Sequence, residues 1–322
     1  MSSAVCGYYG KLPISPEFLR LNAAGPELRW LDEWFQHGVL YAKEQEGPRW
    51  SMLTAESDLW NFLHVPVDQG RIVCGVIFAS QDQAGRFFPF LNFLLIDRHD
   101  FARTPWIVPL MASHFLESAT SGLQFLRKYL DWKAFCRAEH ASEPYILRVQ
   151  VVTEGYQSFL RKVTAEEWWT TLFGNFDDPR KYRLVHGMKR TAHVWKQRAG
   201  LRFPLVLSET LGHYVLPFWI QATLTSVFSE KQNDLGMFAF WNGKPTKVEP
   251  CALISIGSAS SHIVRFIVSP EVHDDAWCDV IGDQASNRVD DTLGHESLRV
   301  LSDPSLPLEK LLPYLSGLSG FI

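Results

Sequence analysis

Two apolar runs separated by a short polar turn constrain this chain more than any other feature. The runs cover residues 71–79 and 87–96, and the turn between them carries Asp82, Gly85 and Arg86. Runs of this length, rich in Val, Ile and Phe and bounded by turn residues, are typical of strands that are buried on both faces. We therefore predict two neighbouring strands at the centre of a sheet, with an exposed turn between them.

The rest of the chain alternates between strand-like and helix-like patterns. Short apolar runs predict further strands at 5–12, 59–65, 145–152, 201–207, 236–241, 251–257 and 262–268. Apolar residues at three- and four-residue steps predict helices from residue 26 to the Gly47-Pro48 pair and at 104–130, 164–173, 213–228, about 274–285 and near the C-terminus. Trp168 and Trp169 point in different directions on a helix, so we expect one in the core and the other at a surface or seam. The predicted fold class is α/β (α+β), with a central, mainly antiparallel sheet covered by helices.

Length and composition set the broad class of protein. The chain has 322 residues, more than one hydrophobic core usually holds, so we predict two similar-sized halves or domains, 1–150 and 151–322. With 46% hydrophobic and 20% charged residues, both halves have the composition of globular domains.

Charge, cysteines and hydropathy exclude several classes of function. The net charge of −4 gives no basic field for nucleic acid. Five scattered cysteines without a C-x-x-C pair argue against a disulfide framework and a zinc site. The first residues, MSSAVCGYYGK, lack a charged region followed by an apolar one, so we expect no secretory signal. No apolar window reaches the roughly 20 residues of a membrane span. We expect a cytoplasmic protein.

Two short strings carry a resemblance to a known family. Gly10-Lys11-Leu12-Pro13 forms a G-K-L-P string, and residues 80–89 form an S-x-D-x-x-G-R-x-F-P string. In this order and spacing they resemble the TagF (ImpM) family of bacterial type VI secretion accessory proteins, most clearly over the first hundred residues or so, within the 1–150 domain. The chain departs from the family where a Gly-Asp-Phe core is typical, because it has Pro16, Glu17 and Phe18 there.

The resemblance implies a function that the residues alone do not. It implies a cytosolic post-translational repressor that holds the type VI secretion apparatus inactive by protein–protein binding, through a forkhead-associated scaffold protein of that system. The fold it implies is α/β. It brings no catalytic residues, so we expect no enzyme and no cofactor, and it implies no known small-molecule ligand. A structural subunit of the secretion machine is an alternative.

The motif positions Lys11, Asp82 and Arg86 are candidates for partner binding. A polar loop held by two buried strands is a rigid platform for recognition. The alternative is structural: Asp82 and Arg86 pair with each other or with the backbone, and Gly85 supplies a positive φ. Lys11 either meets an acidic group of a partner or covers apolar surface with its side-chain stem.

The most unusual charge feature is the acid-free segment 179–202. It contains eight basic residues, and an apolar face of Leu184, Val185, Met188, Ala192 and Trp195 that most of the basic residues flank or oppose. Such a basic amphipathic helix suits an acidic partner. We name Lys189, Arg190 and Lys196 as candidate partner-binding residues. An ordinary exposed helix is the alternative.

Patterns for catalysis are weak. Phosphate-loop, zinc-protease and nucleophile-elbow motifs are missing from the sequence. A cluster in the last fifty or so residues is the basis of an alternative function, a metal-dependent hydrolase or phosphatase, because carboxylate and imidazole groups bind divalent metals. Its members are His273, Asp274, Asp275, Asp290, Asp291, His295 and Glu296. The structural alternative is a helix N-terminus and a polar loop.

Overall fold

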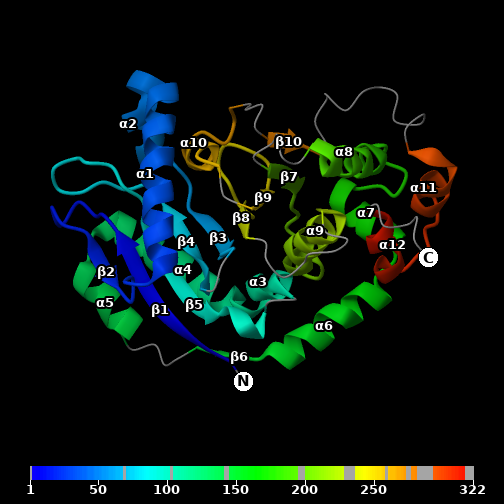
Figure 1. Ribbon diagram of the computed structural model, residues 1–322, viewed down its shortest axis with the longest axis horizontal. Helices are drawn as coiled ribbons and strands as arrows, with labels where there is room; N and C mark the ends of the chain where they lie inside the picture. Colours follow the sequence, from blue (N-terminus) through cyan, green and yellow to red (C-terminus); the bar gives the residue numbers. More distant parts are fainter. Residues whose placement is uncertain are drawn as a thin grey trace.

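One continuous sheet runs through the molecule (Figure 1). The computed structural model describes residues 2–67, 70–101, 104–140, 145–194, 200–227, 236–257, 260–272, 277–280 and 293–315. Within these ranges the sheet has ten strands in the order β10-β7-β9-β8-β3-β4-β5-β1-β2, and β6 also pairs with β1. All pairs are antiparallel except β10 with β7. The predicted α/β class with a mainly antiparallel sheet is confirmed.

The strands follow the apolar runs of the sequence closely in the N-terminal half. They are β1 (Ser2–Gly10), β2 (Leu19–Leu21), β3 (Trp60–Val65), β4 (Arg71–Phe78), β5 (Phe90–Asp97), β6 (Tyr145–Leu147), β7 (Gly200–Pro204), β8 (Met237–Asn242), β9 (Cys251–Ile256) and β10 (Trp277–Asp279). The predicted central pair is β4 and β5, which are antiparallel neighbours in the interior of the sheet.

Both faces of the central strands are buried, which explains why their sequences are apolar throughout. In β5, Phe90, Leu94 and Ile96 enter the hydrophobic core on one face, and Leu91 and Phe93 enter the core on the other. A strand buried on one face only would alternate between apolar and polar residues.

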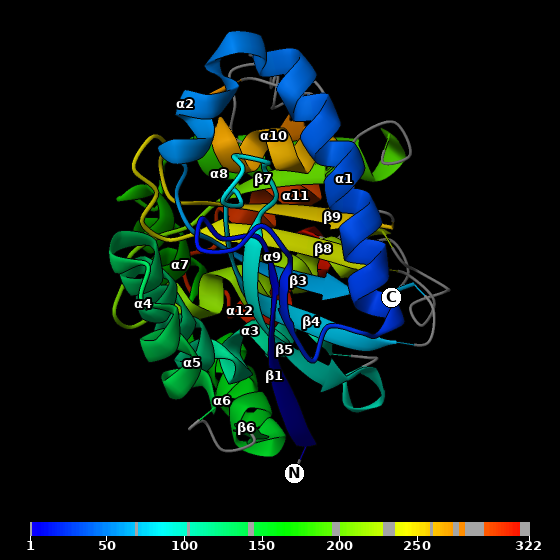
Figure 2. The same cartoon turned by 90° about the vertical axis from the view of Figure 1, so that its left-hand side faces the viewer.

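Helices cover the two faces unequally. One face carries α1 (Pro26–Glu46), α2 (Trp50–Ala55) and α10 (His262–Val268). The other face carries the remaining described α-helices, and Figure 2 shows α1 and α4 on opposite sides of the strands. These are α3 (Val108–Met111), α4 (Ser113–Tyr129), α5 (Trp132–His140), α6 (Val149–Lys162), α7 (Ala165–Phe173), α8 (Arg180–Val194), α9 (Gly212–Val227), α11 (Gly294–Leu301) and α12 (Leu308–Leu315). Short 3-10 turns are η1 (Gly47–Arg49), η2 (Arg98–Asp100) and η3 (Pro105–Ile107).

Local signals set several helix ends. Helix α1 begins with Pro26 in its first turn and ends before Gly47, whose φ is 53°. Proline suits the first turn because its missing N–H would have no partner there. Helix α7 begins with the predicted capping box, in which Thr164 and Glu167 bond each other's backbone N–H.

Three strand and helix predictions are wrong, at least in part. Residues 262–268 form helix α10 and not a strand; its apolar side chains are buried, and a short apolar run does not distinguish a buried helix from a strand. The predicted strand 145–152 ends at Leu147, and α6 begins two residues later. Of the predicted helix at about 274–285, residues 277–279 form β10 and most of the rest lies outside the described residues.

The prediction for the two adjacent tryptophans is also wrong, because both are fully buried. Trp168 packs against Phe218 and Trp219 of α9, and Trp169 stacks on Phe173. Helix α7 is covered on more than one side: α9 contacts it on one, and the segment before α12 is hydrogen-bonded to its first turn. Both side chains therefore reach the core.

The two halves of the chain meet in the middle of the sheet. Strand β3 of the first half pairs with β8 of the second. On the face above them, the buried Glu46 at the end of α1 accepts hydrogen bonds from Arg49 (2.6 Å) and from Arg265 of α10 (2.7 Å). The sheet is thus continuous across residue 150, and the division into domains 1–150 and 151–322 stays a prediction.

Candidate functional site

The two sequence strings that carry the family resemblance lie against each other. The Lys11 ammonium contacts the Asp82 carboxylate at 2.8 Å, and the Arg86 guanidinium contacts the same carboxylate at 2.7 Å. The Asp82 side chain is fully buried, Lys11 is 10% exposed and Arg86 is 62% exposed. Of the three candidate residues, Arg86 is therefore the one that presents most of its side chain to solvent.

The same carboxylate also folds the turn. It accepts hydrogen bonds from the backbone N–H groups of Ala84 (2.9 Å) and Arg86 (2.8 Å), while Gly85 has a φ of 77°. Burial alone would raise the pKa of Asp82, but the Lys11 ammonium and the N–H groups of Arg86 hold it well below its usual value. The structural interpretation of Asp82, Arg86 and Gly85 is confirmed. The role of Lys11, Asp82 and Arg86 in partner binding stays a prediction. Lys11 and Asp82 are buried, so they would affect binding through the shape of the loop.

The segment that departs from the family closes over this loop. The Pro16 carbonyl accepts a hydrogen bond from the Arg86 guanidinium (2.8 Å), and the Ser15 carbonyl accepts one from Gln83 (3.1 Å). The Phe18 ring lies 4.9 Å from the Lys11 ammonium, and it contacts Phe88 edge-on. The contact between the segment and the loop is therefore made by backbone carbonyls and by the Phe18 ring.

Gly10 has a steric reason to be glycine. Its φ is 138°, and a Cβ at this position would lie 2.1 Å from the Pro89 carbonyl oxygen. Any larger residue would push the two motif strings apart. The first glycine of one string and the proline of the other are therefore two sides of a single contact.

The Asp82→Asn variant is expected to lower the melting temperature by several degrees, because two cations lose their shared carboxylate. The folded-state pKa of Asp82 is depressed, so its stabilising effect is present above the usual carboxyl pKa of about 4 and is lost as the pH falls further. The difference from wild type should therefore shrink in acid. Thermal unfolding followed by circular dichroism at pH 7 and pH 3 measures it. Glu17→Gln, at an exposed carboxylate of the same region, is the control, and equal melting temperatures at pH 7 for wild type and Asp82→Asn would contradict the assignment.

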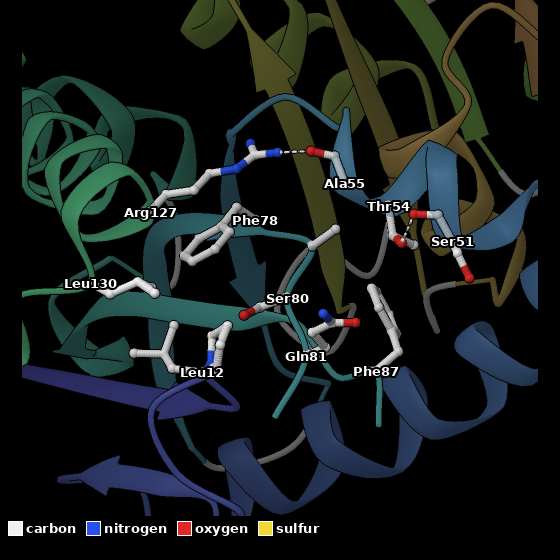
Figure 3. Close-up of a pocket in the computed structure, with 12 residues that line it drawn as sticks. Leu12, Ser51, Thr54, Ala55, Phe78, Ser80, Gln81, Phe87, Arg127 and Leu130 are labelled. Atoms are coloured by element: carbon white, nitrogen blue, oxygen red, sulfur yellow. Dashed lines mark hydrogen bonds between the residues drawn. The ribbon is translucent and has the colours of Figure 1, made fainter. Parts of the chain in front are cut away.

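A pocket of about 290 Å³ opens beside this pair of loops (Figure 3). Its walls combine residues of both strings with residues of α2 and α4. Most of the lining is apolar, and hydroxyl, amide and guanidinium groups lie among it. The lining residues are Leu12, Pro13, Ser51, Thr54, Ala55, Phe78, Ala79, Ser80, Gln81, Phe87, Arg127 and Leu130. This pocket is the candidate binding site.

Arg127 fixes one wall of the pocket. From α4 its guanidinium donates hydrogen bonds to the Ser57 carbonyl (2.6 Å) and to the Ala55 carbonyl, and it lies over the Phe78 ring (Figure 3). Ala55 ends α2, where backbone carbonyls have no partner within the helix. Burial lowers the pKa of the guanidinium, although Asp58 opposes this. Arg127 thus joins α2 to α4 across the pocket.

The predicted basic helix is α8, and its apolar face is confirmed where the structure describes it. Leu184, Val185 and Met188 are buried, whereas the side chain of Ala192 and all of Trp195 lie outside the described residues. Lys189 donates a hydrogen bond to Ser297 of α11 (2.8 Å), and burial lowers its pKa, opposed by Glu296. Arg190 lies in α8, but its side chain is not among those described, and Lys196 lies outside the described residues.

Lys181 is a buried basic residue of α8, whereas the sequence pattern predicts that most basic residues of this helix lie around or opposite its apolar face. Its side chain is fully buried, and its ammonium lies 3.6 Å from the centre of the Phe176 ring. Burial lowers its pKa. Attraction to the face of an aromatic ring partly offsets the hydration that a buried cation loses. Lys181 therefore contributes to packing and not to an exposed basic surface.

The cluster proposed for metal binding lies mostly outside the described residues. His273, Asp274, Asp275, Asp290 and Asp291 belong to that part of the chain, and His295 and Glu296 lie in the first turn of α11. Elsewhere in the described ranges, no group of three or more His, Cys, Asp or Glu side chains is placed to hold a metal ion.

Sequence reasoning missed the part of the pocket that comes from distant segments. Ser51 and Thr54 of α2 and Arg127 of α4 belong to no sequence motif. The sequence pattern indicates only that Arg127 lies in a helix. Contacts between a helix end and a side chain some seventy residues later leave no periodic pattern.

These features define a mixed α/β protein in which two loops from one large sheet frame a small pocket. Residues 7–138 match the TagF N-terminal domain, described as type VI secretion system-associated. The resemblance to the TagF family that the two strings carry is thus confirmed over that range.

A solved structure shares the fold. PA0076 from Pseudomonas aeruginosa PAO1 is 17% identical, with a TM-score of 0.50 over 84% of this chain and 96% of that one. At this identity the likeness concerns the fold alone. No curated protein matches the chain. Of the helices that the structure describes, none combines the length and apolar character needed to cross a membrane.

Proposed function

We propose that this protein is a post-translational repressor of a bacterial type VI secretion system that works in the cytosol by binding another protein. The partner that the family resemblance implies is the forkhead-associated scaffold protein of that system. The proposal treats the chain as a binding protein and not as an enzyme. The observation that carries it is that the two strings typical of the family meet and together frame one pocket.

The pocket has the properties of an anchor site for a partner side chain. A volume of about 290 Å³ suits one large side chain better than a whole cofactor. Binding energy in protein interfaces is concentrated where an aromatic or aliphatic anchor fills a desolvated pocket. Here Phe78 and Phe87 provide apolar walls, and Ser51, Thr54 and Gln81 provide polar groups beside them. We therefore place the partner's anchor residue in this pocket.

The test is a titration of purified protein with the purified forkhead-associated scaffold protein, read by calorimetry. The proposal expects a saturable complex. No heat of binding, together with no co-elution in gel filtration, would contradict the choice of partner. Metal analysis of the same sample tests the alternative function, a metal-dependent hydrolase or phosphatase. That alternative requires Mn, Mg or Zn bound in a one-to-one ratio to the protein.

We also propose the basic segment 179–202, which includes α8, as a second surface for an acidic partner. Reversing Lys189, Arg190 and Lys196 to Glu is expected to weaken the complex about tenfold, because each reversal replaces attraction by repulsion. The effect should shrink at high salt, since screening weakens exposed charge pairs. Reversal of Lys43, Lys162 and Lys310, three exposed lysines on other helices, is the matched control. Equal affinity for both triple variants would remove the segment 179–202 from the interface.

A further inference from the structure

A second and larger cavity lies on the helix-rich face, next to the pocket. It is a groove of about 730 Å³. One wall is α4, with Leu116, Glu117 and Gln124; the other wall includes His213 and Leu216 of α9. The floor includes Asn61 of β3 and Trp241 of β8, the strands at which the two halves of the chain meet.

The groove lies between two helices of this face, and the described helices do not fill it. Helix α4 packs on β4, and α9 packs on β9, so each covers one side of the β3–β8 pair. Pro109 and Leu110 of α3 also line the groove. In layered α/β folds a helix normally covers such a position on a sheet. The groove therefore has the position that a further helix would occupy.

The chemistry of the groove favours a helix over an extended segment. An extended peptide binds well where it can pair its backbone with a free sheet edge. The floor here is a sheet face, which offers side chains and no edge, because β3 and β8 are each paired on both sides. A helix satisfies its own backbone hydrogen bonds and needs from the groove only contacts with its side chains.

The walls also indicate the length and charge of the occupant. From Ser113 to Arg127 the α4 wall is about 21 Å long at 1.5 Å per residue, which matches a helix of about four turns. Four charged residues line the groove. Arg127 and Asp58 bond groups of the fold, namely the Ser57 and Ala55 carbonyls and Thr246. The other two are exposed: the acid Glu117 on α4 and the base Lys244 on the loop after β8. Burial lowers the pKa of His213, so the imidazole adds no charge near neutral pH. An amphipathic helix with a base on one flank and an acid on the other complements this arrangement.

We propose that the groove binds an amphipathic helix of about four turns from the same protein partner whose anchor residue enters the pocket. This inference rests on the proposed function. The two cavities adjoin, since Arg127 lines both of them. A helix in the groove and an anchor in the pocket would then be neighbouring parts of a single interface along α4.

The test is site-specific photo-crosslinking in the complex with the forkhead-associated scaffold protein. A benzophenone amino acid replaces Gln124 in the groove, or Ser118, an exposed residue of α4 outside both cavities, as the control. Crosslinked partner residues are located by mass spectrometry. We expect crosslinks from position 124 to a single partner segment, at residues spaced three or four apart, and few from position 118.

Affinity gives the second readout. Thr120→Trp fills the groove and is expected to weaken the complex at least tenfold, whereas Ser118→Trp is expected to leave it unchanged. Crosslinks spaced two apart, or a complex that forms equally well with Thr120→Trp and without crosslinks at 124, would overturn the helical occupant while leaving the proposed function intact. Absence of any complex with the wild-type chain would instead overturn the proposed function, and this inference with it.

Discussion

Replacing Thr54 by Trp is expected to lower the affinity for the partner about a hundredfold, equivalent to about 2.7 kcal/mol of binding free energy. Thr54 lines the pocket on α2, close to the two motif loops, and is only partly exposed. The indole would occupy the space that we assign to the partner's anchor residue. Losing one central anchor typically costs an interface 2 kcal/mol or more. Calorimetric titration with the scaffold protein measures the effect.

The same helix supplies the control. Met52 is 52% exposed on α2 and lies outside the pocket lining, so Met52→Trp adds the same bulk without entering the pocket. It is expected to bind like the wild type. Ser51→Trp, which also lines the pocket, repeats the test in case Thr54→Trp folds poorly. If both pocket variants keep wild-type affinity and melting temperature, the pocket is not the anchor site.

Acidification from pH 7 to pH 4 is expected to cost about 3 kcal/mol of folding free energy through His64 alone. His64 is buried in β3 against the rings of Trp30 and Phe238, and burial lowers its pKa to about 3. In the unfolded chain its pKa is near 6.5. Between these values the unfolded state binds a proton that the folded state does not. Stability therefore falls by about 1.4 kcal/mol per pH unit as the pH drops through that window.

The His64→Phe variant isolates this effect. Phe keeps an aromatic ring in the stack and removes the titrating group. The free energy of unfolding, measured by urea denaturation between pH 7 and pH 4, should fall less steeply in the variant by about 3 kcal/mol over that range. The carboxylates contribute equally to both proteins and cancel in the difference. Parallel curves would show that His64 takes up its proton in the folded state.

The central strands and the first long helix could be predicted because local sequence determines them. Strands β4 and β5 are buried on both faces and thus read as unbroken apolar runs, and α1 is bounded by Pro26 and Gly47. Helix α10 could not be separated from a strand, since all of its apolar residues face packed neighbours. Its contact with α1 brings Val264 so close to Gly38 that only a glycine fits. That contact is between residues far apart in the chain.

The candidate site was predictable only in its loops. The spacing of Asp82, Gly85 and Arg86 indicates a turn that closes on itself, and the structure confirms this. That Lys11 would complete the cluster depends on β1 lying beside β5, which no local pattern specifies. The pocket depends further on α2 and α4, which reach it from two other parts of the chain and meet through Arg127.

The repression of type VI secretion that we propose for this protein can be measured in a secretion assay. The gene is deleted in its native bacterium, and the deletion strain is complemented with wild type, Met52→Trp or Thr54→Trp, with protein levels checked by immunoblot. We expect that secretion by the type VI system rises on deletion, returns to a low level with wild type and Met52→Trp, and stays high with Thr54→Trp. Secretion that is unchanged or abolished by the deletion would contradict it.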